Sequence, residues 1–218
     1  MAEPLRIFIG YEPRQPVAYN VCAHSIMRNA SVPVAITALK LSQLPITRRG
    51  LTEFTFSRFL VPYLAGFRGM AMFLDQDMIV TGDVLELFKS ADPLNAVSVV
   101  QDQERFEWPS MMIFNAGACL RLTPKFVQDE KNALFDLKWA PSVGRLPKVW
   151  NQIVGYGATD PDARLWHYTR GVPVWPETQG EDEDDKWFKE LEIANSTCAY
   201  KDLMGHSIHA ERPRADQP

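Results

Sequence analysis

Asp75 and Asp77 are the two side chains whose type and spacing most directly suggest chemistry. They follow an unbroken apolar run at residues 70–74, and in extended backbone two side chains at this spacing face the same side. Carboxylates held close together repel each other unless a cation lies between them, and hard cations such as Mg²⁺ or Mn²⁺ suit oxygen ligands. The pair therefore predicts a divalent metal site that could also bind substrate phosphates. The alternative is a pair of turn residues that cap the next element.

The elements before this pair predict where it lies. Residues 70–74 form the continuous apolar run that is typical of a central strand covered on both faces. Upstream, residues 6–10 form a short apolar run, residues 17–29 have a loosely helical pattern, and residues 32–39 are β-branched. Strand, helix and strand in this order predict a right-handed crossover and a parallel sheet. We therefore expect an α/β fold with a mostly parallel central sheet flanked by helices and a ligand site at the carboxyl ends of its strands.

Other segments complete this picture. Residues 51–65 place large apolar side chains at helical spacing, and Pro62 inside the pattern predicts a kink or an early stop. The triplet 78–80 predicts a short strand after the acidic pair, and residues 124–139 predict a helix. Residues 163–168 are the last strand candidate, after which the chain reads as irregular.

The C-terminal part of the chain is strongly polar. An acidic run at residues 181–185 predicts a solvated loop, with a second metal site as the alternative. Residues 211–218 are polar and contain proline, which predicts a disordered tail behind a single domain at residues 1–210.

The composition is that of an ordinary globular protein, and 218 residues suffice for one domain with a sizeable core. The net charge of -4 argues against nucleic acid or an anionic membrane as a partner. Cys22, Cys119 and Cys198 have no paired spacing, which indicates a reducing compartment and neither a disulfide framework nor a zinc site. No run is long enough for a signal sequence or a transmembrane segment, so we expect a cytoplasmic protein.

Residues 58–88, RFLVPYLAGFRGMAMFLDQDMIVTGDVLELF, resemble the core of family 8 glycosyltransferases. That core has an Arg-containing helix, a strand that closes on D-x-D, a short strand and a G-D-[LIV] turn. Residues 114–117, FNAG, resemble the family's F-N-[SA]-G segment, and residues 151–152 resemble its D-Q pair. Residues 167–175 resemble H-[FY]-x-G-x-x-K-P-W, and the opening IFIGYEPR resembles the first strand and the base-binding loop. The ordered set is more specific than any one motif.

The resemblance implies a GT-A fold with a Rossmann-like sheet and a short mixed strand after the D-x-D. It also implies a metal-dependent, retaining hexosyltransferase. Such an enzyme moves a sugar from a nucleotide-diphosphate donor, with a UDP-sugar favoured, to the hydroxyl of a carbohydrate or another acceptor.

Individual roles follow from the same resemblance. The metal ligands would be Asp75, Asp77 and His167, and the imidazole favours Mn²⁺ over Mg²⁺. The donor would contact Gly10, Tyr11, Arg58, Asp75, Gln76, Arg170 and Gly171. The sugar-binding and catalytic amides would be Asn115, Asn151 and Gln152. Each type also has a structural interpretation, as a core histidine, a salt-bridged arginine on a helix surface, a packed tyrosine or a buried hydrogen-bonding amide.

Two positions depart from the family pattern. Asn151 replaces the Asp of the D-Q pair. The Lys of K-P-W is absent, since Val174 and Trp175 follow Pro173, so Arg170 or Lys186 could supply the diphosphate contact. These departures keep open a non-catalytic nucleotide-sugar binding protein on the same fold. Phosphatases of the haloacid dehalogenase type also use a strand-end D-x-D, but there the pair usually lies on an early strand and includes the nucleophile.

Overall fold

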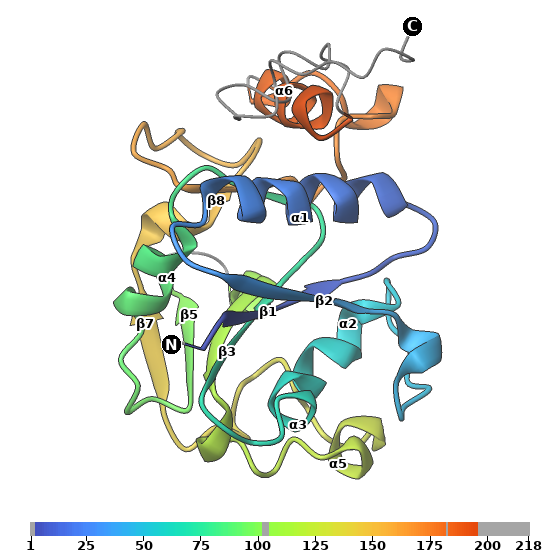
Figure 1. Cartoon of the computed structure of the whole chain (residues 1–218). Coiled ribbons are helices and arrows are strands. Elements are labelled where there is room, and N and C mark those ends of the chain that lie inside the picture. Colours follow the sequence, from blue (N-terminus) through green and yellow to red (C-terminus); the bar gives the residue numbers. More distant parts are fainter. Residues whose placement is uncertain (1–2, 102–104, 182, 196–218) are drawn as a thin grey trace, which may run out of the picture.

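A six-stranded, mostly parallel sheet forms the centre of the molecule (Figure 1). The computed structural model describes residues 3–101, 105–181 and 183–195. The strand order is β2-β1-β3-β6-β5-β7, and β6 is the strand that runs antiparallel to both of its neighbours. The strands are β1 Leu5–Gly10, β2 Val34–Leu39, β3 Met70–Leu74, β5 Val97–Val100, β6 Met111–Asn115 and β7 Val143–Leu146. The predicted α/β class and the parallel pairing of the first two strands are confirmed.

Helices cover both faces of this sheet. Figure 1 shows α1 on one side and α2, α3 and α5 on the other. Alternation along β3 explains this, because Phe73 packs in the core with α2 and α3 whereas Met72 and Leu74 pack in the core with α1 and α4. The α-helices are α1 Pro16–Asn29, α2 Phe54–Ser57, α3 Val61–Leu64, α4 Val84–Ser90, α5 Pro124–Gln128 and α6 Asp184–Ala194. The 3₁₀ turns are η1 Leu41–Gln43, η2 Arg58–Leu60, η3 Arg105–Ser110, η4 Ala116–Ala118, η5 Lys148–Trp150 and η6 Pro176–Thr178.

A smaller sheet continues directly from the acidic pair. It has the order β4-β9-β8, with β4 at Met78–Val80, β9 at Leu165–His167 and β8 at Gln152–Ile153. β4 pairs antiparallel with β9, and β8 pairs parallel with it, so the short mixed strand expected after the D-x-D is confirmed. The register pairs Met78 with His167 and so carries this histidine to the residue that follows Asp77.

Two helical predictions differ from the structure in extent. The helix at residues 51–65 is broken into α2, η2 and α3, with Pro62 in the first turn of α3, as its position predicts. The helix at residues 124–139 is wrong beyond Gln128, because the chain then runs through turns and Leu137 has a positive φ of 56°. Leu134 and Trp139 are buried from these turns, so their apolar spacing reflects contact with the core and not a helix.

The acidic run is not a solvated loop. Helix α6 begins within it, and Glu183 and Asp184 are buried. Asp184 Oδ2 accepts hydrogen bonds from the backbone N–H groups of Gly180 and Glu181, and acids in a first helical turn interact favourably with the helix dipole. Helix α6 packs on α1 (Figure 1).

Several other expectations meet the structure only partly. Cys22 and Cys119 are buried free thiols, whereas Cys198 and the predicted tail at 211–218 lie outside the described residues. The single domain at 1–210 stays a prediction. Across the described ranges, no helix has the length and apolar character needed to cross a membrane.

Candidate metal centre

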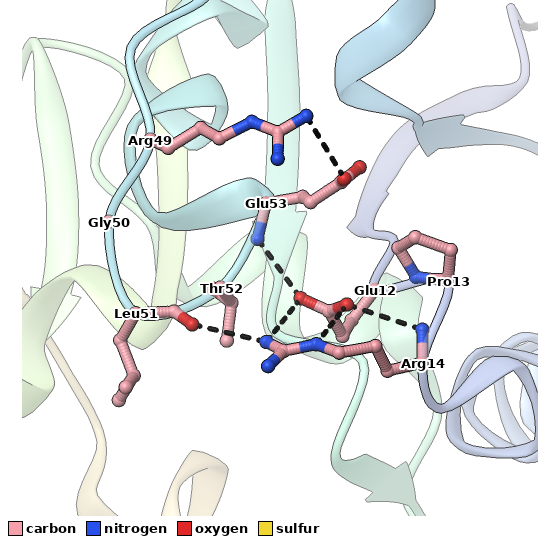
Figure 2. A pocket seen from close by; sticks show the side chains of 8 residues that line it. All are labelled: Glu12, Pro13, Arg14, Arg49, Gly50, Leu51, Thr52 and Glu53. Atoms are coloured by element: carbon pink, nitrogen blue, oxygen red, sulfur yellow. Dashed lines mark hydrogen bonds and ion pairs between the residues drawn. The ribbon is translucent and has the colours of Figure 1, made fainter.

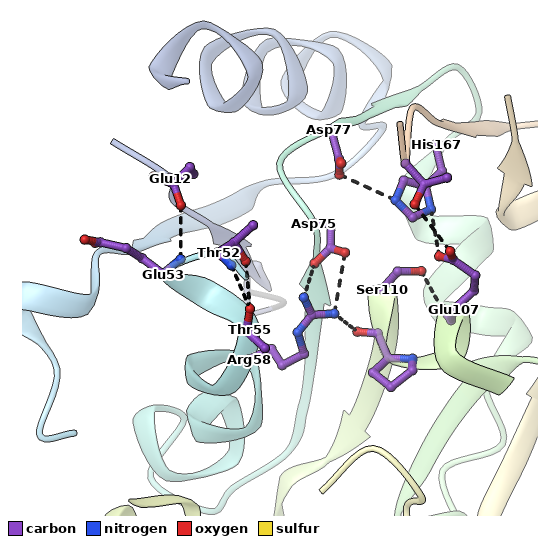
Figure 3. Close-up of polar contacts among 12 residues, drawn as sticks. Glu12, Thr52, Glu53, Thr55, Arg58, Asp75, Asp77, Glu107, Ser110 and His167 are labelled. Carbon is purple, nitrogen blue, oxygen red and sulfur yellow. Dashed lines mark hydrogen bonds and ion pairs between the residues drawn. The ribbon is translucent and has the colours of Figure 1, made fainter. Parts of the chain in front are cut away.

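Asp75, Asp77 and His167 converge at the carboxyl end of β3 (Figure 3). Each offers one ligand atom within 4.8 Å of the others, and no second group of this kind occurs in the part of the chain that the structure describes. His167 Nε2 lies 3.5 Å from Asp77 Oδ1. Asp75 follows β3, Asp77 precedes β4, and His167 ends β9, so the two sheets together position the group. We call these three residues the Asp–Asp–His trio.

The acceptor atoms of the trio fit a cation. Asp75 Oδ1 and Asp77 Oδ1 are buried, and each faces one side-chain nitrogen: Arg58 Nη2 lies 2.9 Å from Asp75 Oδ1, and His167 Nε2 lies 3.5 Å from Asp77 Oδ1. Buried carboxylates of this kind need positive charge nearby, and a bound cation would add to what Arg58 supplies. Two carboxylates and an imidazole are ligands that Mn²⁺ and Mg²⁺ accept, with the nitrogen favouring Mn²⁺.

The pKa shifts of Asp75 and His167 indicate that positive charge would stabilise the trio. Burial raises the pKa of the Asp75 carboxyl despite the opposing charge of Arg58, and the carboxylate of Asp77 raises it further. For His167, burial lowers the pKa, but the nearby carboxylates, led by Asp77, outweigh burial and the net pKa is raised. A cation between Asp75 and Asp77 would remove the repulsion that raises the pKa of Asp75.

Arg58 is the ion-pair partner of Asp75, one member of the trio. Its guanidinium is buried; Nη1 donates to Pro109 O at 2.8 Å, and Nη2 lies beside Asp75 Oδ1. The guanidinium also lies over the ring of Phe73, at 4.9 Å from the centroid. The interpretation of Arg58 as a salt-bridge partner on a helix surface is therefore wrong, because Arg58 is inside the protein and its partner is a candidate metal ligand.

Turn η3, just before β6, carries supporting residues that the sequence patterns did not reveal. Ser110 O accepts the backbone N–H of Asp75 at 2.9 Å, and Asn151 Nδ2 donates to Ser110 Oγ at 3.0 Å. Glu107 is buried, with Oε2 at 3.7 Å from His167 Nδ1. The only sequence signal for this turn is its place before a strand, since its residues form no metal-binding motif. Asn151 thus lies near the trio, through Ser110.

Gln76 joins the acidic pair to the loop after β1. Its Oε1 accepts the backbone N–H of Glu12 at 2.8 Å, and its Nε2 donates to Gln15 O at 3.3 Å. The side chain that was expected to contact a donor is therefore engaged with the backbone of residues 12–15.

A pocket of about 310 Å³ opens beside this loop (Figure 2). Its wall includes Glu12, whose carboxylate accepts hydrogen bonds from Arg14 and from the backbone N–H of Glu53. The full lining is Glu12, Pro13, Arg14, Arg49, Gly50, Leu51, Thr52 and Glu53. The pKa of the Glu12 carboxyl is lowered, and the largest cause is the hydrogen bond from the Arg14 side chain. Hydrogen bonds from the backbone N–H groups of Glu53 and Arg14 also lower it, and together they outweigh the effect of burial.

Gly10 and Tyr11 have local packing roles in this structure. A Cβ at Gly10 would lie 2.5 Å from the ring of Phe54, so a glycine is required for the contact between β1 and α2. Tyr11 packs edge-on against Tyr19, with ring centroids 5.5 Å apart, and is not among the residues that line the pocket.

The structure does not bring Asn115 to the trio. In the antiparallel pairing of β3 and β6, Leu74 is opposite Met111 whereas Met70 is opposite Asn115. Asn115 therefore lies at the other end of β3, about 17 Å along the strand from Asp75 at ~3.4 Å per residue. Its Nδ2 donates to Pro93 O. The direction of β6 carries FNAG to the end of the strands that is farther from the trio, and a sugar contact of Asn115 stays a prediction.

Arg170, Gly171 and Gln152 lie around β9 and β8. Arg170 is largely exposed, pairs with Glu181 at 2.7 Å and lies over the ring of Tyr156, so its guanidinium faces these groups. Gly171 has a φ of 113°, a conformation that favours glycine. Gln152 is buried, and its Oε1 accepts the backbone N–H of Asp160. Their roles toward a donor stay predictions.

Comparison with known proteins adds to this geometry. Protein CDI of Arabidopsis thaliana is 34% identical over 230 residues, which cover 88% of this chain and 88% of that protein. No family model matches the chain. Similar solved structures are apo WbbM, a bifunctional glycosyltransferase (TM-score 0.64, 16% identity), the glycosyltransferase GlyE of Streptococcus pneumoniae TIGR4 (0.62, 15%) and the galactosyltransferase LgtC in complex with donor and acceptor sugar analogs (0.57, 11%).

The extent of these structural matches differs. Each covers 87% or 88% of this chain, but the chain covers 50% of WbbM, 63% of GlyE and 96% of LgtC. The chain therefore spans about half of the first of these proteins. At such low identities the likeness shows the fold, and the fold is of the GT-A type.

Proposed function

Because the chain belongs to the family of Arabidopsis thaliana Protein CDI and has a GT-A fold, we propose that it is a metal-dependent glycosyltransferase. The observation that carries the proposal is the Asp–Asp–His trio at the carboxyl end of β3. Its residues follow β3, precede β4 and end β9, and each offers one ligand atom within 4.8 Å of the others. The finer proposal is a retaining transfer of a hexose from a UDP-sugar to an acceptor hydroxyl, with Mn²⁺ at the trio.

The residues around the trio support a division of roles. Asp75, Asp77 and His167 would hold the cation, which supplies positive charge against a diphosphate leaving group. Arg58 holds the carboxylate of Asp75 in place and adds a buried positive charge. Asn151, whose amide donates to Ser110 Oγ, and Gln152 are proposed to contact the sugar.

The loop after β1 is proposed to hold the nucleoside of the donor. Gln76 ties this loop to the acidic pair, so a nucleoside beside it would place its diphosphate toward the trio. Glu12 accepts the backbone N–H of Glu53 and so joins the loop to the other wall of the pocket (Figure 2). Preorganised contacts of this kind reduce the entropy lost on binding.

A panel of nucleotide-sugars tests the proposal. Full-length protein with Mn²⁺ is incubated with each donor, and release of nucleoside diphosphate is measured with and without a chelator. We expect release with one donor class, loss of release on metal removal, and a loss of at least ~100-fold in Asp77→Asn. Asp185→Asn is the control, because Asp185 is an exposed acid in α6. Equal release by wild type and Asp77→Asn would contradict the proposed role of the trio.

The alternative function is a nucleotide-sugar binding protein without turnover. It is favoured by Asn151, which stands where the family 8 pattern has the Asp of its D-Q pair. The amide of Asn151 donates to Ser110 Oγ. Metal-dependent binding of UDP without release from any donor would support this alternative. The phosphatase hypothesis depended on the D-x-D alone, and the GT-A fold removes its basis.

A further inference from the structure

His167 Nδ1 is a buried nitrogen without a hydrogen-bond partner among the described residues. The side chain of His167 is 2% exposed, and its other nitrogen, Nε2, faces Asp77. A histidine binds a metal through a nitrogen that carries no proton, so the ring proton must then sit on the other nitrogen. For Nε2 to bind a cation beside Asp77, Nδ1 must carry the proton and needs an acceptor.

Glu107 lies where that acceptor is required. Its Oε2 is 3.7 Å from His167 Nδ1, on the side of the ring opposite Asp77 (Figure 3). The carboxylate is buried, and its Oε1 accepts the hydroxyl of Thr169 at 3.3 Å. The distance to Nδ1 is longer than a hydrogen bond, and such contacts tighten when a site is filled.

The backbone around Glu107 is fixed to the other parts of the site. Ser110 Oγ donates to Glu107 O at 2.6 Å, and Ser110 O accepts the N–H of Asp75. Pro109 O accepts from Arg58, the partner of Asp75. Turn η3 thus contacts both Asp75 and its partner Arg58. These contacts fix the position of the Glu107 carboxylate relative to the proposed cation site.

We infer that Glu107 is a positioning residue that accepts the Nδ1 proton of His167 and thereby presents the Nε2 lone pair to the cation. The inference depends on the proposed metal site and assigns Glu107 no contact with the cation or with a donor. A carboxylate behind a metal-binding histidine fixes both the tautomer and the ring orientation, and loss of such a partner weakens metal binding 10- to 100-fold, as an order of magnitude.

Direct binding of Mn²⁺ alone to the full chain tests this inference. Free Mn²⁺ is measured by electron paramagnetic resonance for wild type, Glu107→Gln, Glu107→Ala and Asp77→Asn. We expect at least ~10-fold weaker binding in Glu107→Ala and a smaller loss in Glu107→Gln, whose amide oxygen can still accept the Nδ1 proton. Nitrogen NMR of the histidine rings is recorded on wild type with Mg²⁺ in place of the paramagnetic Mn²⁺. The signal of His167 is assigned as the one missing from His167→Gln, and we expect it to show a proton on Nδ1.

Controls separate positioning from folding. Glu190→Gln changes another buried acid, one that pairs with His24 and Arg28 between α1 and α6, and should lower thermal stability without changing Mn²⁺ affinity. If wild type and Glu107→Ala bind Mn²⁺ within twofold while Asp77→Asn has lost binding, the role of Glu107 is overturned and the metal site stands. If wild type binds no Mn²⁺, the proposed metal site fails and the inference fails with it.

Discussion

Asp75 illustrates how one carboxylate serves two neighbours. One oxygen lies 2.9 Å from Arg58 Nη2, while the same carboxylate faces Asp77 and His167 in the trio. The buried guanidinium keeps the acidic pair from accumulating uncompensated negative charge when no cation is bound, since buried charges need a partner. Arg58 is therefore as much a part of the site's electrostatics as the trio itself.

Gly10 permits the first strand to meet α2, and its replacement tests that contact. Gly10→Ala should destabilise the protein by about 1–3 kcal/mol, because the new methyl would overlap the ring of Phe54. Urea denaturation gives the free energy of unfolding. Gly117→Ala is the matched control, since a Cβ there meets its neighbours only at 3.5 Å or more. Equal stability of Gly10→Ala and wild type would show that Phe54 moves aside at no cost.

At the scale of elements, α4 is fixed by its N-terminal cap. Asp83 accepts the N–H of Leu85 at 3.0 Å and also accepts from the backbone and hydroxyl of Ser31. One carboxylate thus starts the helix that follows β4 and ties it to the loop before β2. Since β4 also carries the register that positions His167, the cap contributes to the frame of the site.

Asp83→Ala should lower the free energy of unfolding by about 1 kcal/mol at neutral pH through loss of the cap. Burial raises the pKa of Asp83, but hydrogen bonds from Ser31 and Leu85 outweigh burial and lower the net pKa below its ordinary value of 3.8. The stabilisation is therefore fully present above the ordinary pKa and is lost as pH falls through the lowered one. Denaturation at pH 7 and below pH 4 should show the difference between wild type and variant shrinking. A constant difference would contradict the charge contribution.

At the scale of the whole molecule, α6 is joined to the rest through α1. Trp187 is fully buried in a cluster with Ala18 and Val21 of α1, and Glu190 pairs with Arg28. These contacts join α6 to α1, and the single domain at residues 1–210 stays a prediction. Figure 1 shows α6 on the side of α1 that faces away from the central sheet.

Glu190→Gln should lower the free energy of unfolding by about 1–2 kcal/mol, a figure reduced because Arg28 is 41% exposed. Far-UV circular dichroism and tryptophan fluorescence should still give one coincident transition. A separate early transition of α6 would contradict a single domain. Limited proteolysis that removes more than the segment 211–218 from native protein would contradict the predicted tail.

The sequence by itself determined β1, β2, β3 and β4, the mostly parallel sheet and the acidic pair, because these depend on local patterns. The apolar run at residues 70–74 is typical of a strand buried on both faces, and the carboxylates that follow such a strand lie at its carboxyl end. The break at Pro62 is equally local, since proline removes a backbone donor. The place of His167 was indicated only through family resemblance.

The tertiary structure decided everything that depends on partners distant in the chain. Pairing of β4 with β9 brings His167 to Asp77, and packing of η3 places Glu107 behind the imidazole. The antiparallel direction of β6 places Asn115 at the end of the strands farther from the trio, and no local pattern encodes that direction. Helix α6 starts in a run of acids because its buried face packs on α1. Contacts of this kind arise from long-range packing and register, and single-sequence periodicity carries no information about them.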